Sequence, residues 1–316
     1  MWRYILKRLL WMIPVLLGVT WLIFTLLYFV PGDPAYTILG PTATEGDLQA
    51  MRETLGLTDG YFTRLFRYLG DVILRFDFGK SYVGGTSVTA EIMSRLPNTL
   101  ILCLGCMLLS VIVGIPLGIN AAVHQGGLWD SGSMLIALAG VSMPPFWVGL
   151  LLVLVFSLRL GWLPSVGYAG ITYFILPWIS NSFQGLALQA RQTRSGMLEV
   201  LSSDYITTAR AKGMSKRQVI FGHALPNALI PVITVAGTSL GNMLGGTVVI
   251  ESLFAIPGVG SYMITGVNGR DYPVVMASVI ILALLFAIIM LLVDLLYAAV
   301  DPRIKAQYSA KRRVRG

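Results

Sequence analysis

The stretch SSDYITTARAKGMSKRQVIFGHALPNA, residues 202–228, is polar and basic, whereas the sequence further along on either side is strongly apolar. Gly213 near its middle stands where a helix can end in a left-handed turn. Pro226 near its end is expected to stop a second helix, because proline lacks the backbone N–H that a helix interior needs. We therefore predict two short helices joined at a glycine, and we call residues 202–228 the elbow.

Capping residues mark where the two helices of the elbow begin. Ser203 or Asp204 can cap the first helix. Ser215 is followed three residues later by Gln218, which is the spacing of a capping box for the second helix. If this stretch faces the cytoplasm, which its basic residues favour in a membrane protein, a rigid structure there indicates a contact that transmits force to a cytoplasmic partner. The alternative, an anchor for anionic lipid, explains the charge but not the caps.

The whole chain has the composition of an integral membrane protein. Of its 316 residues, 55% are hydrophobic and 12% are charged, whereas soluble domains carry about 25% charged residues. A net charge of +8 in such a chain indicates cytoplasmic anchoring and membrane lipid rather than nucleic acid. Cys103 and Cys106 lie in an apolar run, and we expect both to be small packing residues.

Six apolar segments are long enough, or nearly so, to cross a membrane, which takes about 20 residues. They are residues 9–30, 99–123, 133–158, 173–192, 228–250 and 275–300. The fourth is the weakest, because it contains several serine, asparagine and glutamine residues. Either this segment is a helix that faces a wet cavity or it is not a span.

Lysine and arginine set the orientation, because they favour the cytoplasmic side when counted over short loops. With the amino terminus inside, the inside segments hold 15 of the 23 basic residues, and the short outside loops hold only Arg159 and Arg270. The other six lie between residues 31 and 97, a segment long enough to escape the rule. We therefore predict six spans with both termini cytoplasmic.

This topology divides the chain into four parts. Residues 31–97 contain eight acids among apolar and aromatic residues, and we expect a small helical cap outside the cell rather than disorder. The other parts are the amino-terminal end with the first span (1–30), a five-helix core (98–300) that contains a cytoplasmic coupling loop (193–227), and a basic cytoplasmic tail (301–316).

The motifs for catalysis or metal binding are weak. The GKS at 79–81 resembles the end of a phosphate-binding loop, but that loop needs a glycine where Leu74 stands. His124 and His223 are the only histidines, and two isolated histidines make no metal site by themselves. We expect a non-catalytic chain that itself holds neither a cofactor nor a metal.

Two features inside the spans indicate helix packing. Gly237, Gly241 and Gly245 repeat every four residues, and such lines of small residues let two membrane helices approach closely. They predict a helix–helix interface, either inside the bundle or with a partner subunit. Asp294 lies near the inner end of the last span, and we expect a structural hydrogen bond there rather than a proton relay, which would need a second titratable group at that depth.

The elbow resembles the coupling loop of permease subunits of binding-protein-dependent ABC importers. In that family Glu-Ala-Ala is followed after three residues by Gly, and after nine more by Ile-x-Leu-Pro; Ala209, Gly213, Leu225 and Pro226 stand at the matching positions. Threonines at 207 and 208 and the histidine at 223 depart from the pattern. The string YITTARAKG is nevertheless similar to the version found in peptide, glutathione and nickel permeases.

The resemblance to that branch covers nearly the whole chain. It rests on PGDP at 31–34, LGL at 55–57, DFG at 77–79 with Ser81, LP at 176–177, Glu251 with PGVG at 257–260, RDYP at 270–273 and VDLLYAAVDPRI at 293–304. The set is similar to the first of the two permeases of dipeptide, oligopeptide and nickel importers. The short loop between the third and fourth spans is more like that of glutathione or nickel members.

The resemblance implies an all-α permease with the type I ABC importer fold, in a bacterial inner membrane. Its implied partners are a second, unlike permease, two ATPase subunits that bind ATP and Mg, and an extracytoplasmic binding protein. The implied cargo is short peptides, with glutathione or a nickel chelate as alternatives. The residues implied to dock the ATPase are Tyr205, Ala209, Arg210, Ala211, Lys212, Gly213, Leu225 and Pro226.

The substrate path is expected where polar groups lie inside the membrane, since unsatisfied polar groups in hydrocarbon cost several kcal/mol. Ser182, Gly185 and Gln189 share one face of the fourth span. That face should line a water-filled cavity or a protein interface, and we favour the cavity. The candidates for the path are Asn181, Ser182, Gln184, Gln189, Asn242 and Glu251.

Two other classes of function are weighed against an importer subunit. An ion-gradient-driven secondary transporter would need paired acids within the membrane and inverted repeats, whereas the sequence offers Asp294 alone. An intramembrane enzyme would need a catalytic set. The sequence favours the importer.

Overall fold

A computed structural model describes residues 2–300 of the chain, and the fold of that part is helical, with a single isolated bridge between Lys80 and Ser87. The predicted tail at 301–316 lies outside the described residues. The long helices are α1 (Trp2–Phe29), α5 (Val88–Val123), α6 (Leu128–Ser142), α8 (Thr172–Leu201), α11 (Leu225–Leu253) and α13 (Tyr272–Val300). The short ones are α2 (Pro34–Leu39), α3 (Glu45–Thr54), α4 (Tyr61–Arg75), α7 (Pro145–Leu152), α9 (Asp204–Ala211), α10 (Lys216–Gln218) and α12 (Val259–Asn268).

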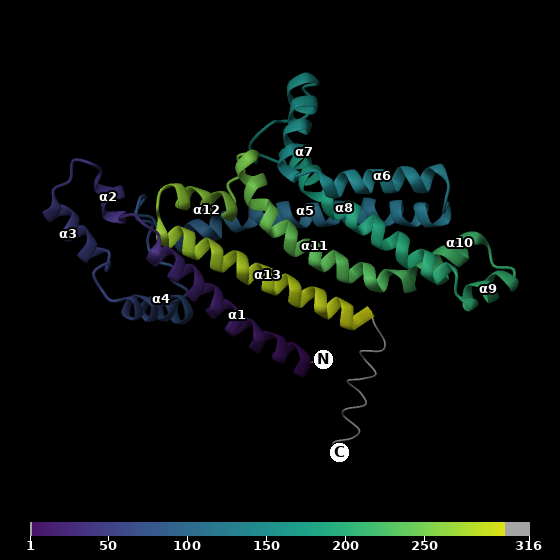
Figure 1. The fold of residues 1–316 in the computed structure, drawn as a ribbon, viewed down its shortest axis with the longest axis horizontal. Coiled ribbons are helices and arrows are strands. Elements are labelled where there is room, and N and C mark those ends of the chain that lie inside the picture. Colours follow the sequence, from purple (N-terminus) through teal and green to yellow (C-terminus); the bar gives the residue numbers. More distant parts are fainter. Residues whose placement is uncertain (1, 301–316) are drawn as a thin grey trace, which may run out of the picture.

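Helix α8 lies at the centre of the bundle and packs against α5, α6 and α11, while α11 packs on α13 and α13 on α1 (Figure 1). Glycines make the closest of these contacts. A Cβ atom added at Gly114 would lie 2.8 Å from the carbonyl oxygen of Leu186, and one at Gly118 would lie 2.5 Å from that of Ala190. Backbones therefore touch along the α5–α8 seam, as small residues permit in membrane bundles.

Four helical segments in the described part are long and apolar enough to cross a membrane. They are Ile5–Phe29, Val88–Val123, Pro231–Leu253 and Tyr272–Leu295. A bent pair, Leu128–Ser142 with Pro145–Arg159, adds a fifth if it counts as one span. Helix α8 is long enough but too polar to belong to this set. The chain is thus a multi-pass membrane protein, and the predicted count of six spans stays a prediction.

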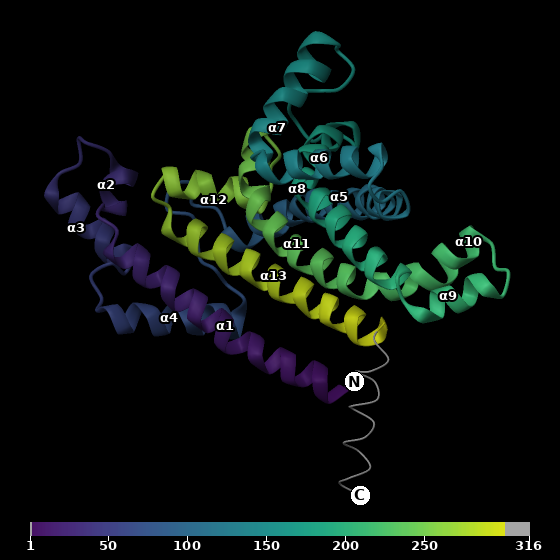
Figure 2. The same cartoon turned by 45° about the vertical axis from the view of Figure 1, so that its right-hand side comes forward.

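The predicted third span, residues 133–158, is wrong as one continuous helix. The chain bends by 106° between α6 and the helix that follows. The cause is the pair Pro144-Pro145: a proline pushes the residue before it out of the helical region, and Met143 is extended there with ψ of 127°. Pro145 then starts α7, which continues as a π-helix over Val153–Arg159 and projects from the bundle (Figures 1 and 2).

The segments α2, α3 and α4 gather at one end of the molecule, and α9 and α10 lie at the opposite end (Figure 1). Helix α5 begins at Val88, so the domain boundary predicted between residues 97 and 98 lies inside a continuous helix. The segment before α5 is fastened to the start of α13. The carboxylate of Asp271 accepts hydrogen bonds from the hydroxyl of Ser81 and from the backbone N–H of Tyr82 (3.0 Å) and Val83 (3.3 Å).

Candidate functional site

The elbow begins with α9 and turns at Gly213. The N–H of Gly213 donates to the carbonyl of Arg210 (3.0 Å), and the N–H of Met214 donates to that of Ala209 (3.4 Å). Gly213 has φ of +79°, a conformation that glycine adopts without steric cost. The left-handed turn predicted at this residue is confirmed.

The second helix of the elbow starts with the predicted capping box. The hydroxyl of Ser215 accepts from the N–H of Gln218 (3.4 Å), and the side-chain oxygen of Gln218 accepts from the N–H of Ser215 (3.0 Å). Ser203 is the N-cap residue of α9, although its side chain makes no capping bond.

The prediction that Pro226 stops this second helix is wrong. The helix passes from α10 through a π-helical segment, Val219–Ala224, directly into α11. Pro226 is the second residue of α11, inside this continuous run, and it has no N–H to donate. The π-helical segment shifts the hydrogen-bond register just before the proline, and the elbow is therefore continuous with a bundle helix.

The elbow is anchored by apolar side chains that point into the bundle. Ile206 and Ala209 are buried against Met197 of α8 and Ile119 of α5, together with Val219. The buried side chain of Ala209 thus helps to hold the elbow against the bundle. The predicted docking residues that remain exposed are Tyr205, Arg210, Ala211, Lys212, Gly213 and Pro226, while Leu225 is half-buried.

A hollow of about 850 Å³ lies beside the elbow, at the carboxyl end of α5. Its walls include His124, Leu198, Met214 and Lys216. Two of the residues that line it, Arg210 and Lys216, are exposed and basic. The elbow and this hollow together form an exposed surface with several basic residues at one end of the bundle.

An ion pair near this end was not predicted from the sequence. Arg194 of α8 donates two hydrogen bonds to Asp130 of α6, at 2.6 and 2.8 Å, and the N–H of Gly126 donates a third at 3.0 Å. Asp130 is buried. The sequence indicates this ion pair only through an acid in the first turn of an apolar helix, and that pattern does not identify the basic partner.

The predicted path residues separate into two groups. Asn181, Ser182 and Gln189 are at most 3% exposed, because α8 packs this side between α5 and α11. Ser182 and Gln189 lie in the packed interface between α8 and its neighbours, whereas Asn181 also lines the hollow that Gln184 and Asn242 border. Gln184 and Asn242 are exposed and border a hollow of about 40 Å³ that Pro145 also lines.

Glu251 is fully buried at the end of α11, where it holds the following turn rather than lining a hollow. Its carboxylate accepts from the hydroxyl of Thr99 (2.7 Å) and from the N–H of Ser261 (2.8 Å). A Cβ atom at Gly258 would collide with this carboxylate. The position of the Glu251 carboxylate therefore explains why residue 258 is a glycine, and its hydrogen bonds hold the PGVG turn in place.

The three glycines that repeat along α11 differ in their surroundings. A Cβ atom at Gly237 would collide with Val293, and one at Gly241 with Phe286, both on α13. Gly245 is exposed and meets nothing within 4 Å. Two of the three glycines thus serve packing within the chain.

Asp294 forms an ion pair with Arg8 of α1 at 3.0 Å. The pair joins α13 to α1, and the structural role expected for this acid stays a prediction.

Two family models match the sequence and together cover nearly all of it. The Binding-protein-dependent transport system inner membrane component matches residues 114–306, and the N-terminal model of such membrane components matches residues 1–103. The chain belongs to this family. Residues 202–228 fall within the first match, so the elbow lies in the family's shared part.

Curated members of the family are similar over almost the full length. The dipeptide transport system permease protein DppB of Alkalihalophilus pseudofirmus is 40% identical over 96% of this chain and 100% of its own. The glutathione transport system permease protein GsiC is 43% identical in Salmonella paratyphi A and 42% identical in Escherichia coli, over 96% of this chain and 99% of each relative.

Solved structures of the family's fold include the MetNI methionine ABC transporter in inward-facing conformations. One of its chains matches with a TM-score of 0.58 at 19% identity, covering 67% of this chain and 97% of that chain. At this identity the likeness concerns the fold alone. The predicted ABC importer permease fold is thereby confirmed.

Proposed function

We propose that this chain is the transmembrane permease subunit of an ATP-driven importer for short peptides, and that the elbow docks it to an ATPase. The observation that carries the proposal is the elbow itself: a glycine-hinged, capped turn, anchored by Ile206 and Ala209 and continuous with α11. A movement imposed on its exposed face passes into the bundle through α11 and α8. The family membership supports an ATPase as the source of that movement.

The proposed assembly has one chain of this kind, one unlike permease, two ATPase subunits and an extracytoplasmic binding protein. ATP and Mg are bound by the ATPase subunits. Both termini and the elbow face the cytoplasm, which agrees with the basic residues on the elbow. The end that carries α2, α3 and α4 then faces outward.

The proposed path runs between the two permeases rather than through this chain alone. Gln184 and Asn242 are exposed on neighbouring helices, and lipid would reject such side chains.

The cargo class follows from relatives that transport dipeptide and glutathione and are nearly equally similar to this chain. We assign short peptides, with glutathione as one of them.

The proposal is tested by ATP-driven uptake. The chain would be reconstituted in proteoliposomes with its partner permease, ATPases and binding protein, and accumulation of labelled dipeptide and glutathione would be measured. We expect uptake that requires ATP and the binding protein. Accumulation driven by a proton or sodium gradient without ATPase subunits would instead establish a secondary transporter.

A further inference from the structure

Helix α4 is amphipathic, and its faces differ in what surrounds them. Successive residues of an α-helix lie about 100° apart around its axis, so Phe62, Phe66 and Ile73 fall within about 40° of one another. These three side chains are 68, 67 and 62% exposed, and we call them the apolar flank. Leu65 and Val72 lie on a second face, which packs against the rest of the chain.

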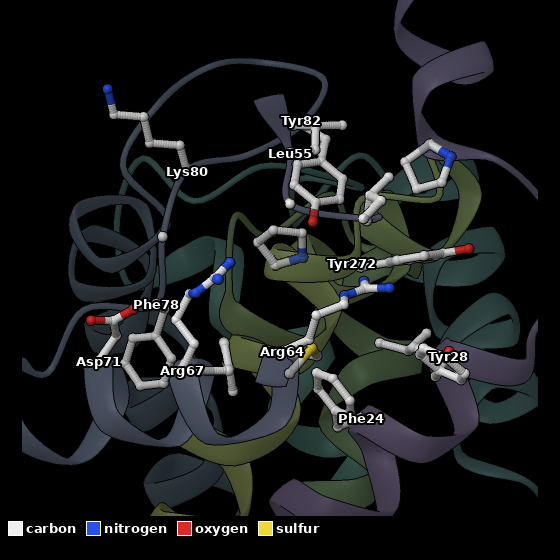
Figure 3. Close-up of a pocket in the computed structure, with 18 of the residues that line it drawn as sticks. Phe24, Tyr28, Leu55, Arg64, Arg67, Asp71, Phe78, Lys80, Tyr82 and Tyr272 are labelled. Atoms are coloured by element: carbon white, nitrogen blue, oxygen red, sulfur yellow. The ribbon is translucent and has the colours of Figure 1, made fainter. Parts of the chain in front are cut away.

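The third face of α4 is charged and points away from the apolar flank. Arg64, Arg67 and Asp71 lie about 120–180° around the helix from that flank, and Figure 3 shows their side chains beside a pocket of about 400 Å³. Leu74, which is 83% exposed, lies between the two sides near the end of the helix. Helix α4 thus keeps a charged side and an apolar side apart while its remaining face holds it in place.

Helix α4 lies beside the ends of two candidate spans (Figures 1 and 2). Leu65 is buried against Phe24 of α1 and Met276 of α13, and both of these residues belong to candidate spans. They are five and four residues from the nearer ends of those spans, or about 8 and 6 Å at 1.5 Å per residue. Val72, in the last turn of α4, packs against a cluster that contains Val274. The helix therefore stays at the level of the span ends along its length.

A series of aromatic rings joins the end of α1 to the apolar flank. The ring centres are 5.4 Å apart between Phe29 and Tyr28, and 5.1 Å apart between Tyr28 and Tyr61. They are 5.1 Å apart between Tyr61 and Phe62, and 6.5 Å apart between Phe62 and Phe66. Tyrosine is enriched at the level where a membrane meets water. The apolar flank thus continues the surface of α1 without a break.

The surface of α1 that this series continues is itself apolar and open. Trp21, Leu22 and Leu26 are each 54% exposed, and Phe29 is 74% exposed. Only 11% of the most apolar 18 residues of this span are buried within the chain. In a membrane protein such a surface contacts acyl chains or a neighbouring subunit, and the same holds for a flank that continues it at the same level.

We propose that α4 is an interfacial helix, embedded along its apolar flank in the lipid leaflet at this end of the molecule. The side chains of that flank lie among acyl chains, Tyr28 and Tyr61 lie at the headgroups, and the charged side of α4 faces water. The segment 31–97, expected from the sequence to be a cap outside the cell, is then partly within the membrane.

The order of side chains around α4 favours lipid over a second protein. Apolar side chains, tyrosines and charged side chains follow one another around the helix and its contact with α1, which is the order of layers from hydrocarbon to water. An amphipathic helix at a membrane surface has this arrangement. A protein partner would bury the apolar flank equally well, but it would not require the flank to lie at the level where the spans end.

The test is the surroundings of a spin label on the apolar flank. The assembled importer, with its native cysteines replaced, would be labelled at Phe62→Cys, Phe66→Cys or Ile73→Cys and reconstituted in proteoliposomes. Collisions of each label would be measured with oxygen, which concentrates in hydrocarbon, and with a neutral gadolinium chelate, which stays in water. The reference for water is Ala50→Cys, an exposed position on α3. We expect the oxygen-to-chelate ratio on the flank to exceed the reference severalfold, and the ratio at Arg75→Cys, on the charged side, to match it.

Each outcome of this measurement decides. Frequent collisions with oxygen and rare ones with the chelate, at the flank alone, support the interfacial helix. A ratio on the flank equal to the water reference places α4 outside the membrane and overturns the proposal. Rare collisions with both reagents show that a protein surface covers the flank, which overturns the assignment to lipid. Three labelled positions prevent a single disturbing label from deciding. Uptake is not the readout, so the result is independent of the proposed transport function.

Discussion

Gly213 is the residue on which the shape of the elbow depends. Its φ is +79°, and an added Cβ atom would meet nothing within 4 Å, so the cost of replacing it is backbone strain alone. That strain is about 1–2 kcal/mol for a residue with a Cβ atom, which disfavours the turn by roughly 5- to 30-fold. We predict that Gly213→Val inserts normally in the membrane but binds the ATPase less well and lowers ATP-dependent uptake at least about fivefold.

The matched control is Gly222→Val. Gly222 is also exposed and has open space around it, but its φ is not positive. Uptake should therefore stay close to that of the unaltered protein. Normal uptake with Gly213→Val, or an equal loss in both variants, would show that the left-handed turn is not what couples the elbow.

Single residues were predictable where their partners are near in sequence. The turn at Gly213 and the capping box of Ser215 involve partners three to five residues away, and local rules describe them. The pair Arg194–Asp130 spans 64 residues and the contact of Ser81 with Asp271 spans 190. No local pattern relates such residues, because tertiary packing brings them together.

Helices α11 and α13 approach closely at Gly241, whose added Cβ atom would collide with the ring of Phe286. Gly241→Leu should therefore push the two helices apart or displace that ring. Overpacking of this kind costs about 1–3 kcal/mol, and we expect a lower melting temperature of the purified complex together with reduced uptake.

Gly245→Leu separates packing within the chain from contact with another subunit. Gly245 is one turn further along α11 and faces open space, so a leucine there should leave the melting temperature of the isolated chain unchanged. If Gly245→Leu destabilises the isolated chain as strongly as Gly241→Leu, the close approach at Phe286 is not the reason for the glycine line.

Composition alone is enough to predict a long apolar helix, but it does not predict where such a helix bends. The apolar runs of α1, α5, α11 and α13 predict candidate spans that the structure also has. The apolar run of the third segment does not reveal the bend that Pro144 and Pro145 cause. The polarity of α8 correctly excluded lipid from one of its faces. The polarity of that face does not show whether water or another helix covers it. In the structure, α5 and α11 pack against it.

At the scale of the whole molecule, the substrate path stays a prediction, and the burial of some of its residues narrows the candidates. The buried state of Ser182 and Gln189 moves the expected path to Gln184 and Asn242. With Cys103 and Cys106 replaced, cysteines at 184 and 242 should react with a water-soluble thiol reagent during ATP turnover, and cysteines at 182 and 189 should be protected. Fast labelling at 189 with protection at 184 would restore the face predicted from the sequence.

The central claim is that the elbow meets the ATPase, and crosslinking tests it most directly. Ala211 is exposed on the elbow, and Phe66 is exposed on α4, which lies near the opposite end of the molecule (Figure 1). A photo-crosslinker attached to Ala211→Cys or Phe66→Cys, with Cys103 and Cys106 replaced, would be activated in the assembled importer. The account predicts an adduct with the ATPase from position 211 and none from position 66. No ATPase adduct from 211, or an ATPase adduct from 66, would contradict it.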